Sequence, residues 1–304
     1  MSRRTINCLP RADERYRRAV RCCIETKEAA KKEDATRARL LRTVAANGSR
    51  LVHAQYCTNM AAWLEQAAGN TTAVNSRASA CRMRKHRIDI ASSLHQIIDR
   101  SGLDAATFTL VSGSWTITAS ALPSIDPNDL LNGIRSDFIR AGVDLSNGAL
   151  FMAIDGAFER NRSLYQLHVN GVALGTAIDA IEKLRALDKY RRIESCTATT
   201  LPIYRPIVLS RQALTNLPST LAYRLKHYWP CTWLPMDGST NRSRNEQRIP
   251  EPYHSQWLLW MDRWELSDLT LLMGMFVGKG SFTLTNGGAE SDGHLGKHRG
   301  GVPK

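Results

Sequence analysis

Two neighbouring stretches of alternating side chains, at residues 148–158 and 164–174, restrict the possible folds of this chain more than any other feature. Both are rich in apolar and β-branched residues, and the short segment between them is polar. If the four residues 160–163 form the loop, Glu159 lies opposite Leu164 and the stretches pair as an antiparallel hairpin. The sequence therefore predicts two central strands of a sheet with a defined register.

Three polar side chains share one face of this hairpin. Side chains alternate between faces along a strand, so His168 and Asn170 point the same way while Val169 points into the other layer. The register places Asp155 directly opposite His168, with Cβ atoms about 4.5–5.5 Å apart. An imidazole, an amide oxygen and a carboxylate then converge, a set that suits Mg²⁺ or Mn²⁺ better than a structural zinc ion. The alternative is a hydrogen-bonded structural histidine beside an asparagine that marks a strand edge or bulge.

The order of the expected elements predicts a mixed α+β fold. Strands are expected at 106–117, 148–158, 164–174 and 196–210, and helices at 124–142, 176–190 and 217–229. This β-α-β-β-α-β-α order is that of the split βαβ, or ferredoxin-like, plan. In that plan an antiparallel sheet carries helices on one face and leaves the other face free for a site.

The remaining segments extend this domain at both ends. We expect a basic helical N-terminal region over 1–103, the sheet domain over 104–232, a helical C-terminal extension over 233–285 and a disordered tail over 286–304. Within the N-terminal region, helices are expected at 12–46, 51–68 and 81–102. One helix is expected over 255–276, whose side formed by Trp257, Trp260 and Trp264 covers the domain core or, alternatively, docks a partner or a second copy.

The charge of the chain indicates a polyanionic partner. Its 304 residues include 41 Lys and Arg against 28 Asp and Glu, a formal net charge of +13, which makes nucleic acid the leading candidate. Within the N-terminal region, the helix over 12–46 is expected to be a solvated arm that lies along a phosphate backbone, or a solvent-facing helix with no ligand. Four further basic residues are expected to clamp phosphates: Arg82, Arg84, Lys85 and Arg87.

The sequence lacks the signals of export and of metal-binding cysteine clusters. It has no run of about 18 apolar residues and no secretory signal, so we expect no membrane association and a location in the cytoplasm. Its seven cysteines show no paired C-x-x-C spacing, which predicts free thiols rather than disulfides or a closed zinc site.

A candidate nucleophile lies in "TLAYRLKHYWP" (220–230). Tyr223 and Lys226 are three residues apart and therefore share one face of the expected helix. A tyrosine hydroxyl can attack a phosphodiester, a nearby ammonium can stabilise the developing charge, and a divalent cation can polarise the phosphate. Tyr228, at the end of the same helix, is the alternative nucleophile, and the alternative role for Tyr223 is that of a surface residue on an amphipathic helix.

Together these features resemble the HUH endonuclease superfamily, especially the rolling-circle replication initiators of plasmids and phages. The resemblance covers roughly 105–230 and rests on three motifs in order, which are "FTLVSGSW" (108–115), Asp155 with His168-Val169-Asn170, and Tyr223-x-x-Lys226. In that family, two histidines that flank a hydrophobic residue hold a metal ion with an upstream acidic residue. A helix tyrosine nicks single-stranded DNA and stays attached to the 5′ phosphate.

The resemblance implies a role for each matching residue. Asp155 and His168 would be metal ligands, Tyr223 the nucleophile and Lys226 its electrostatic helper. The second motif histidine is Asn170 here, a position at which some initiators carry an amide. The implied function is metal-dependent nicking and joining of single-stranded or origin-hairpin DNA for a plasmid, phage or other mobile element. The same fold with a weakened site would instead be a DNA-binding repressor or accessory factor.

Overall fold

A computed structural model describes residues 9–69, 76–195, 197–210, 214–226, 228–233, 247–278 and 280–285. The expected disordered tail over 286–304 lies outside these residues, as does most of the polar segment over 69–76. Among the helices so described, none is both long enough and apolar enough to span a membrane.

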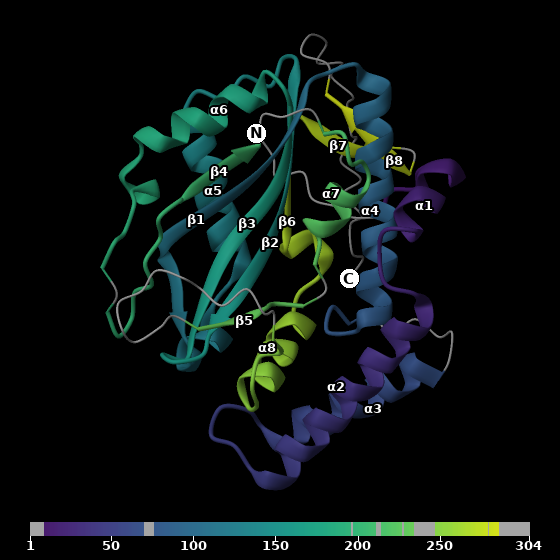
Figure 1. The fold of residues 1–304 in the computed structure, drawn as a ribbon, viewed down its shortest axis with the longest axis vertical. Helices are drawn as coiled ribbons and strands as arrows, with labels where there is room; N and C mark the ends of the chain where they lie inside the picture. The colour runs from purple at the N-terminus through teal and green to yellow at the C-terminus, as the bar shows by residue number, and fades with distance from the viewer. Residues whose placement is uncertain are drawn as a thin grey trace, which may run out of the picture.

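A six-stranded sheet forms the centre of a mixed α+β fold (Figure 1). Its strands run in the order β4-β1-β3-β2, and β5 and β6 both pair with the far edge of β2. All pairings are antiparallel except that of β2 with β5. The strands are β1 (Ala105–Thr118), β2 (Gly148–Glu159), β3 (Leu164–Gly175), β4 (Ile207–Ser210), β5 (Cys231–Thr232) and β6 (Thr270–Met273).

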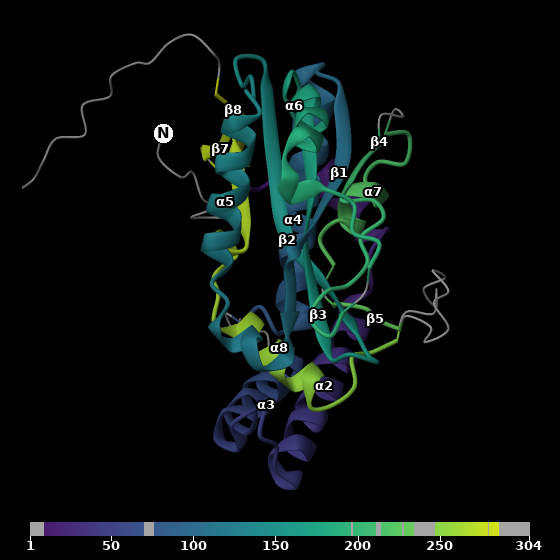
Figure 2. The ribbon, with the colours of Figure 1, turned by 90° about the vertical axis from the view of Figure 1, so that its left-hand side faces the viewer.

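Helices lie on both faces of this sheet. Figure 2 shows α6 in front of the strands and α4 behind them. Phe108, Met152 and Val169 point into the core under α5 and α6, while Phe151 and Val172 point to the face under α4 and α7. The expectation of a free second face is therefore wrong over part of the sheet, because apolar side chains on that face require cover. Helices α5 (Pro127–Arg140) and α6 (Ala177–Lys183) cover one face, and α4 (Ala80–Ser101) and α7 (Ser219–Tyr223) cover part of the other. Helix α1 (Glu14–Arg21) packs against α4.

The elements with clear end signals match the sequence expectation. Helix α5 begins after Asp126, whose carboxylate accepts a hydrogen bond from the Asn128 backbone N–H. Helix α4 ends at Gly102, which adopts a left-handed conformation with φ of 66°. Both ends are set by local chemistry, so they can be read without knowledge of the packing.

Two expected elements are much shorter than the sequence suggests. Within the expected strand over 196–210, Ile207–Ser210 forms a strand of the sheet, and Ile203 makes an isolated antiparallel bridge to Ile193. The pairing is interrupted because Pro202 and Pro206 have no N–H to donate to a neighbouring strand. The expected helix over 217–229 forms as the shorter α7, which begins at Ser219, ends at Tyr223 and has five residues.

The expected helix over 255–276 is wrong in its second half. Helix α8 (Tyr253–Asp262) ends early, and Thr270–Met273 joins the sheet as β6. Between β6 and the next strand, Gly274 has a φ of 68°, and a Cβ there would lie 2.2 Å from the Gly148 carbonyl oxygen. An apolar run fits a buried strand as well as a buried helix, so periodicity alone could not separate them. The hairpin β7 (Met275–Gly278) and β8 (Ser281–Leu284) follows.

The tryptophan side of α8 covers the core, as preferred from the sequence. Trp257 and Trp260 are buried, and their rings lie 5.8 and 5.6 Å from the ring of Trp229. Trp260 also donates a hydrogen bond to the Ile125 carbonyl. Two buried tryptophans of this side are thus part of the fold and not exposed for a partner.

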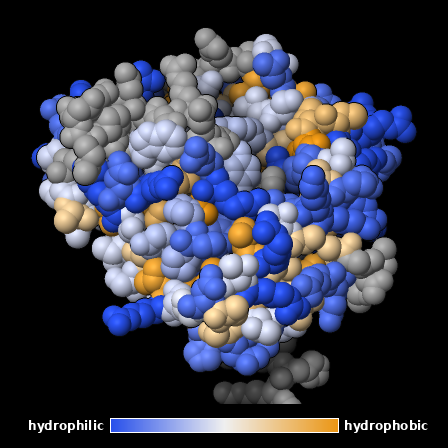
Figure 3. Space-filling view, turned by 60° about the horizontal axis from the view of Figure 1, so that its bottom comes forward, coloured by the Kyte–Doolittle hydropathy of each residue, from blue (hydrophilic) through white to orange (hydrophobic). Residues whose placement is uncertain are grey.

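The N-terminal helices are docked onto the rest of the fold. Helices α2 (Lys27–Asn47) and α3 (Ala54–Gly69) pack against each other and against α8, with Leu41 and Leu64 fully buried. The expectation of a solvated arm is therefore wrong for the buried side of α2. Figure 3 shows this end of the molecule, where hydrophilic side chains dominate and apolar ones are scattered among them.

Buried Asp34 of α2 caps the N-terminus of α4. Its carboxylate accepts hydrogen bonds from the Ser79 hydroxyl at 2.7 Å and from the backbone N–H groups of Ala80 and Cys81 at 2.6 and 3.2 Å. A carboxylate at a helix N-terminus satisfies donors that have no partner within the helix and also opposes the positive end of the helix dipole. This contact joins the N-terminal helices to the helix that covers the sheet.

We predict that Asp34→Ala lowers the free energy of unfolding by about 2–4 kcal/mol, because buried donors lose their acceptor. Asp34→Asn should lose less, since one amide oxygen remains to accept. Chemical denaturation measures both, with exposed Lys32→Ala on the same helix as the control. Equal stability of Asp34→Ala and Lys32→Ala would contradict the role of the cap.

A second prediction concerns acid stability. Burial works against ionisation of Glu33, but hydrogen bonds and charges from Arg248 and Arg37 outweigh it and lower its pKa from 4.5 to about 2. A pKa that is lower in the folded state stabilises the protein above pH 4.5, and this stabilisation is lost as the pH falls towards 2.

Glu33→Gln should therefore be less stable than the wild type at pH 7, and the difference should shrink steadily below pH 4.5. Thermal melts from pH 7 to pH 3 measure this trend. Glu28→Gln, an exposed change on the same helix, is the matched control and should follow the wild type. A constant difference between Glu33→Gln and the wild type at all pH values would argue against the ion pairs.

Candidate functional site

The hairpin β2–β3 has the register that the sequence predicts. Glu159 pairs with Leu164, and Asp155 pairs with His168. The Asp155 Oδ2 atom lies 3.3 Å from His168 Nε2. A carboxylate and an imidazole thus form a pair on the face that α4 and α7 partly cover.

Asn170 joins this pair through a hydrogen-bond network. Its Nδ2 donates to Asp155 Oδ2 at 2.8 Å, and its Oδ1 accepts from the Thr109 hydroxyl at 2.8 Å. Oδ1 also faces Arg224 Nη1 at 3.3 Å. An arginine only donates and an ionised carboxylate only accepts, so the network itself fixes the orientation of the amide. The oxygen that a cation would use is therefore turned towards a guanidinium.

Arg224 fastens α7 to the sheet. It directly follows α7, and its guanidinium donates to the Thr109 hydroxyl at 2.6 Å and to the Thr107 hydroxyl at 3.2 Å. Thr107 and Thr109 share the face of Asn170, since Thr109 pairs with Asn170 in the register of β1 and β3. Tyr223, the last residue of α7, is thereby held beside the polar face.

Tyr223 and Lys226 lie together although the helix does not extend to Lys226. The Tyr223 side chain is 56% exposed, and Lys226 Nζ lies 4.3 Å from the centroid of its ring. Tyr228, the alternative nucleophile, lies beyond the helix and is partly buried against the core. Of the two tyrosines, Tyr223 is thus the one whose ring is more available to a substrate.

The expected phosphate clamp is only partly at the surface. Arg87 is buried, and its guanidinium binds Glu25 and donates to the Ala222 carbonyl of α7 at 3.2 and 3.3 Å. Arg84 donates to the Glu25 carbonyl at 2.7 Å. Lys85 is exposed, while Arg82 is half-buried. A phosphate-binding role does not suit Arg87, since its charge is used to hold α7.

Asp155 and His168 fit two neighbouring ligands of one divalent ion. Their 3.3 Å separation is close to that of adjacent ligands bound at about 2.0–2.2 Å. His168 keeps 19% of its side chain exposed, whereas Asp155 and Asn170 are buried. Nowhere in the described ranges do three or more His, Cys, Asp or Glu side chains gather as a metal site. A cation here would be held by two side chains and would keep several waters, as Mg²⁺ commonly does.

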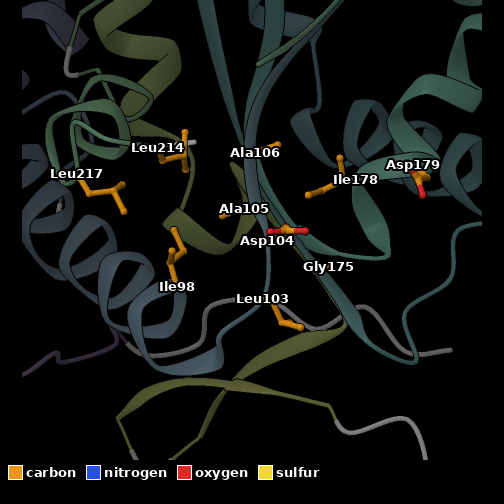
Figure 4. A pocket seen from close by; sticks show the side chains of 10 residues that line it. All are labelled: Ile98, Leu103, Asp104, Ala105, Ala106, Gly175, Ile178, Asp179, Leu214 and Leu217. Atoms are coloured by element: carbon orange, nitrogen blue, oxygen red, sulfur yellow. The ribbon is translucent and has the colours of Figure 1, made fainter. Parts of the chain in front are cut away.

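A separate cavity of about 550 Å³ lies at one end of the sheet (Figure 4). Most of its lining residues have apolar side chains, and two acidic residues, Asp104 before β1 and Asp179 of α6, also line it. None of the candidate site residues lines it. The site is therefore a surface of the sheet rather than this cavity.

Comparisons of the chain with protein-family models, with curated proteins and with solved structures find no match.

Sequence reasoning missed Thr107, Thr109 and Arg224. The two threonines had a detectable signal, because they alternate with Phe108 and Leu110 along β1 and so belong to a polar stripe. Arg224 had no detectable signal in the sequence, since the direction of its side chain depends on where α7 ends.

We predict that Arg87→Met lowers the free energy of unfolding by about 3 kcal/mol, because it removes both the ion pair with Glu25 and the hydrogen bonds to the Ala222 carbonyl. Lys85→Met, an exposed change on the same helix, should stay within about 0.5 kcal/mol of the wild type. Urea denaturation compares the two variants. If Lys85→Met proved the more damaging, Arg87 would not have the structural role assigned to it.

Proposed function

We propose that this protein is an HUH-type DNA endonuclease that nicks and rejoins single-stranded or origin-hairpin DNA to start replication of a plasmid, phage or other mobile element in the cytoplasm. The observation that carries this proposal is the position of Tyr223 at the end of α7. Arg224, the residue after Tyr223, forms hydrogen bonds to the face of the sheet that carries Asp155 and His168.

The arrangement of strands and helices supports the proposal. The order β4-β1-β3-β2 is antiparallel throughout, with α5 connecting β1 to β2 and α6 lying between β3 and β4 in the chain. That arrangement agrees with the ferredoxin-like plan that the resemblance implies. It also leaves the carboxylate and imidazole on the central strands, where rigid elements hold them.

The chemistry of the side chains supports nucleophilic attack by Tyr223. The tyrosine oxygen bonds to the scissile phosphorus, and the bond from phosphorus to the 3′ oxygen breaks. The products are a 5′ phosphotyrosine and a free 3′ hydroxyl, which takes up the proton that the tyrosine loses. Lys226 places a positive charge beside the ring on which negative charge develops. The reverse reaction rejoins the strand.

Asp155 and His168 are the residues that would hold a Mg²⁺ or Mn²⁺ ion. When bound, such an ion polarises the scissile phosphate. The positive net charge of +13 favours a polyanionic substrate and faster encounter with it at low salt.

A second candidate is a DNA-binding protein of the same fold with a weakened site, acting as a repressor or accessory factor. The observation that favours it is the hydrogen bond between Asn170 and Arg224, which removes one oxygen from the ligand set. The two candidates share DNA binding and differ in the covalent step.

The covalent step separates these candidates. The wild type should form a covalent adduct with a labelled single-stranded oligonucleotide in Mn²⁺, and Tyr223→Phe should lose it by at least a hundredfold while oligonucleotide affinity stays within about twofold, because only the attacking oxygen is removed. Denaturing gel electrophoresis detects the adduct. Tyr228→Phe is the matched control and should retain it. Binding by the wild type with no adduct under any condition would favour the second candidate.

A further inference from the structure

The polar face of the sheet already contains a cation. The Arg224 guanidinium lies within hydrogen-bond distance of Thr107, Thr109 and Asn170, and Asn170 bonds in turn to Asp155. Burial lowers the pKa of Arg224, while the nearby Tyr223 and Asp155 act in the opposite direction. An arginine keeps its charge in such a setting, so the positive charge at the face is permanent.

This guanidinium opposes a divalent ion in two ways. It binds the Asn170 oxygen, which leaves Asp155 and His168 as the side-chain ligands. It also repels a second positive charge placed on the same small face, and partial burial weakens the screening of that repulsion. The Asp155 carboxylate therefore faces both the guanidinium and any incoming ion.

A phosphodiester would change this balance of charge. Its negative charge, brought to the face by the strand that Tyr223 attacks, offsets the excess positive charge and supplies further oxygen ligands of the kind that Mg²⁺ and Mn²⁺ prefer. Binding of the strand and binding of the ion then favour each other, and the coupling is reciprocal.

We propose that Arg224 prevents the free site from holding a divalent ion and that the ion is taken up together with the phosphodiester strand. The identity of the strand as DNA rests on the proposed function, whereas the opposition between Arg224 and the ion rests on the geometry alone.

Binding of Mn²⁺, measured by electron paramagnetic resonance, tests this coupling. All proteins carry Tyr223→Phe so that no strand is cut, and a His168→Ala protein with the same oligonucleotide gives the background from ions on the DNA. Without oligonucleotide, the protein with Arg224 should bind Mn²⁺ weakly, and a saturating single-stranded oligonucleotide should tighten the affinity at least tenfold. Arg224→Met should tighten Mn²⁺ binding at least tenfold in the absence of DNA and reduce the effect of the oligonucleotide.

Matched variants show whether a change in Mn²⁺ affinity comes from the loss of the Arg224 charge or from loosening of α7. Arg224→Gln removes the charge but keeps a hydrogen-bond donor, and it should behave like Arg224→Met. Arg224→Lys keeps the charge and should bind Mn²⁺ as weakly as the parent protein. Arg87→Met removes the support of α7 from the α4 side without touching Asn170, and its Mn²⁺ affinity should not change. Thermal melts establish which variants are folded.

Three results would overturn the proposal. They are an unchanged Mn²⁺ affinity in both Arg224→Met and Arg224→Gln, an equal rise in affinity in Arg87→Met, or strong Mn²⁺ binding by the parent protein that DNA does not affect. Failure of the proposed function appears separately, as the absence of a covalent adduct from the protein that retains Tyr223 while the dependence of Mn²⁺ binding on Arg224 persists.

Discussion

The contact between Arg224 and the polar face of the sheet is the interaction on which the candidate site depends. Helix α7 has five residues, too few to be stable as an isolated helix, so its position is set by the groups that hold its end. Arg224 bonds that end to Thr107 and Thr109, while Arg87 bonds the preceding carbonyl to α4. Two guanidiniums from different elements thus decide where Tyr223 lies.

The basic composition of the chain is used inside the fold as well as on its surface. Arg37 is fully buried and bonds to Glu33 and to the Ala78 carbonyl, and Arg87 binds Glu25. Glu33 and Glu25 of the N-terminal segment therefore have basic partners within the molecule, and part of the positive charge of the chain is used structurally. The surface available to a polyanion has to be judged from exposed residues such as Lys85.

The sequence alone predicts the features that depend on neighbouring residues in the chain. The hairpin, its register and the common face of Asp155 and His168 follow from a period of two and a short loop. The remainder depends on distant contacts. Contacts with distant parts of the chain decide where α7 ends and how the Arg224 side chain is directed. They also decide whether the apolar residues 270–273 form a strand or a helix. The residue pattern within these segments does not predict such contacts.

The far edge of β2 carries two short strands, β6 near its start and β5 at its end. They occupy backbone donors and acceptors that an exposed edge would offer to another chain. Pairing between molecules is thereby directed to the opposite edge, where β4 has only four residues and follows Pro206. So short an edge gives a poor template for further strands, which protects the sheet from growing by self-association.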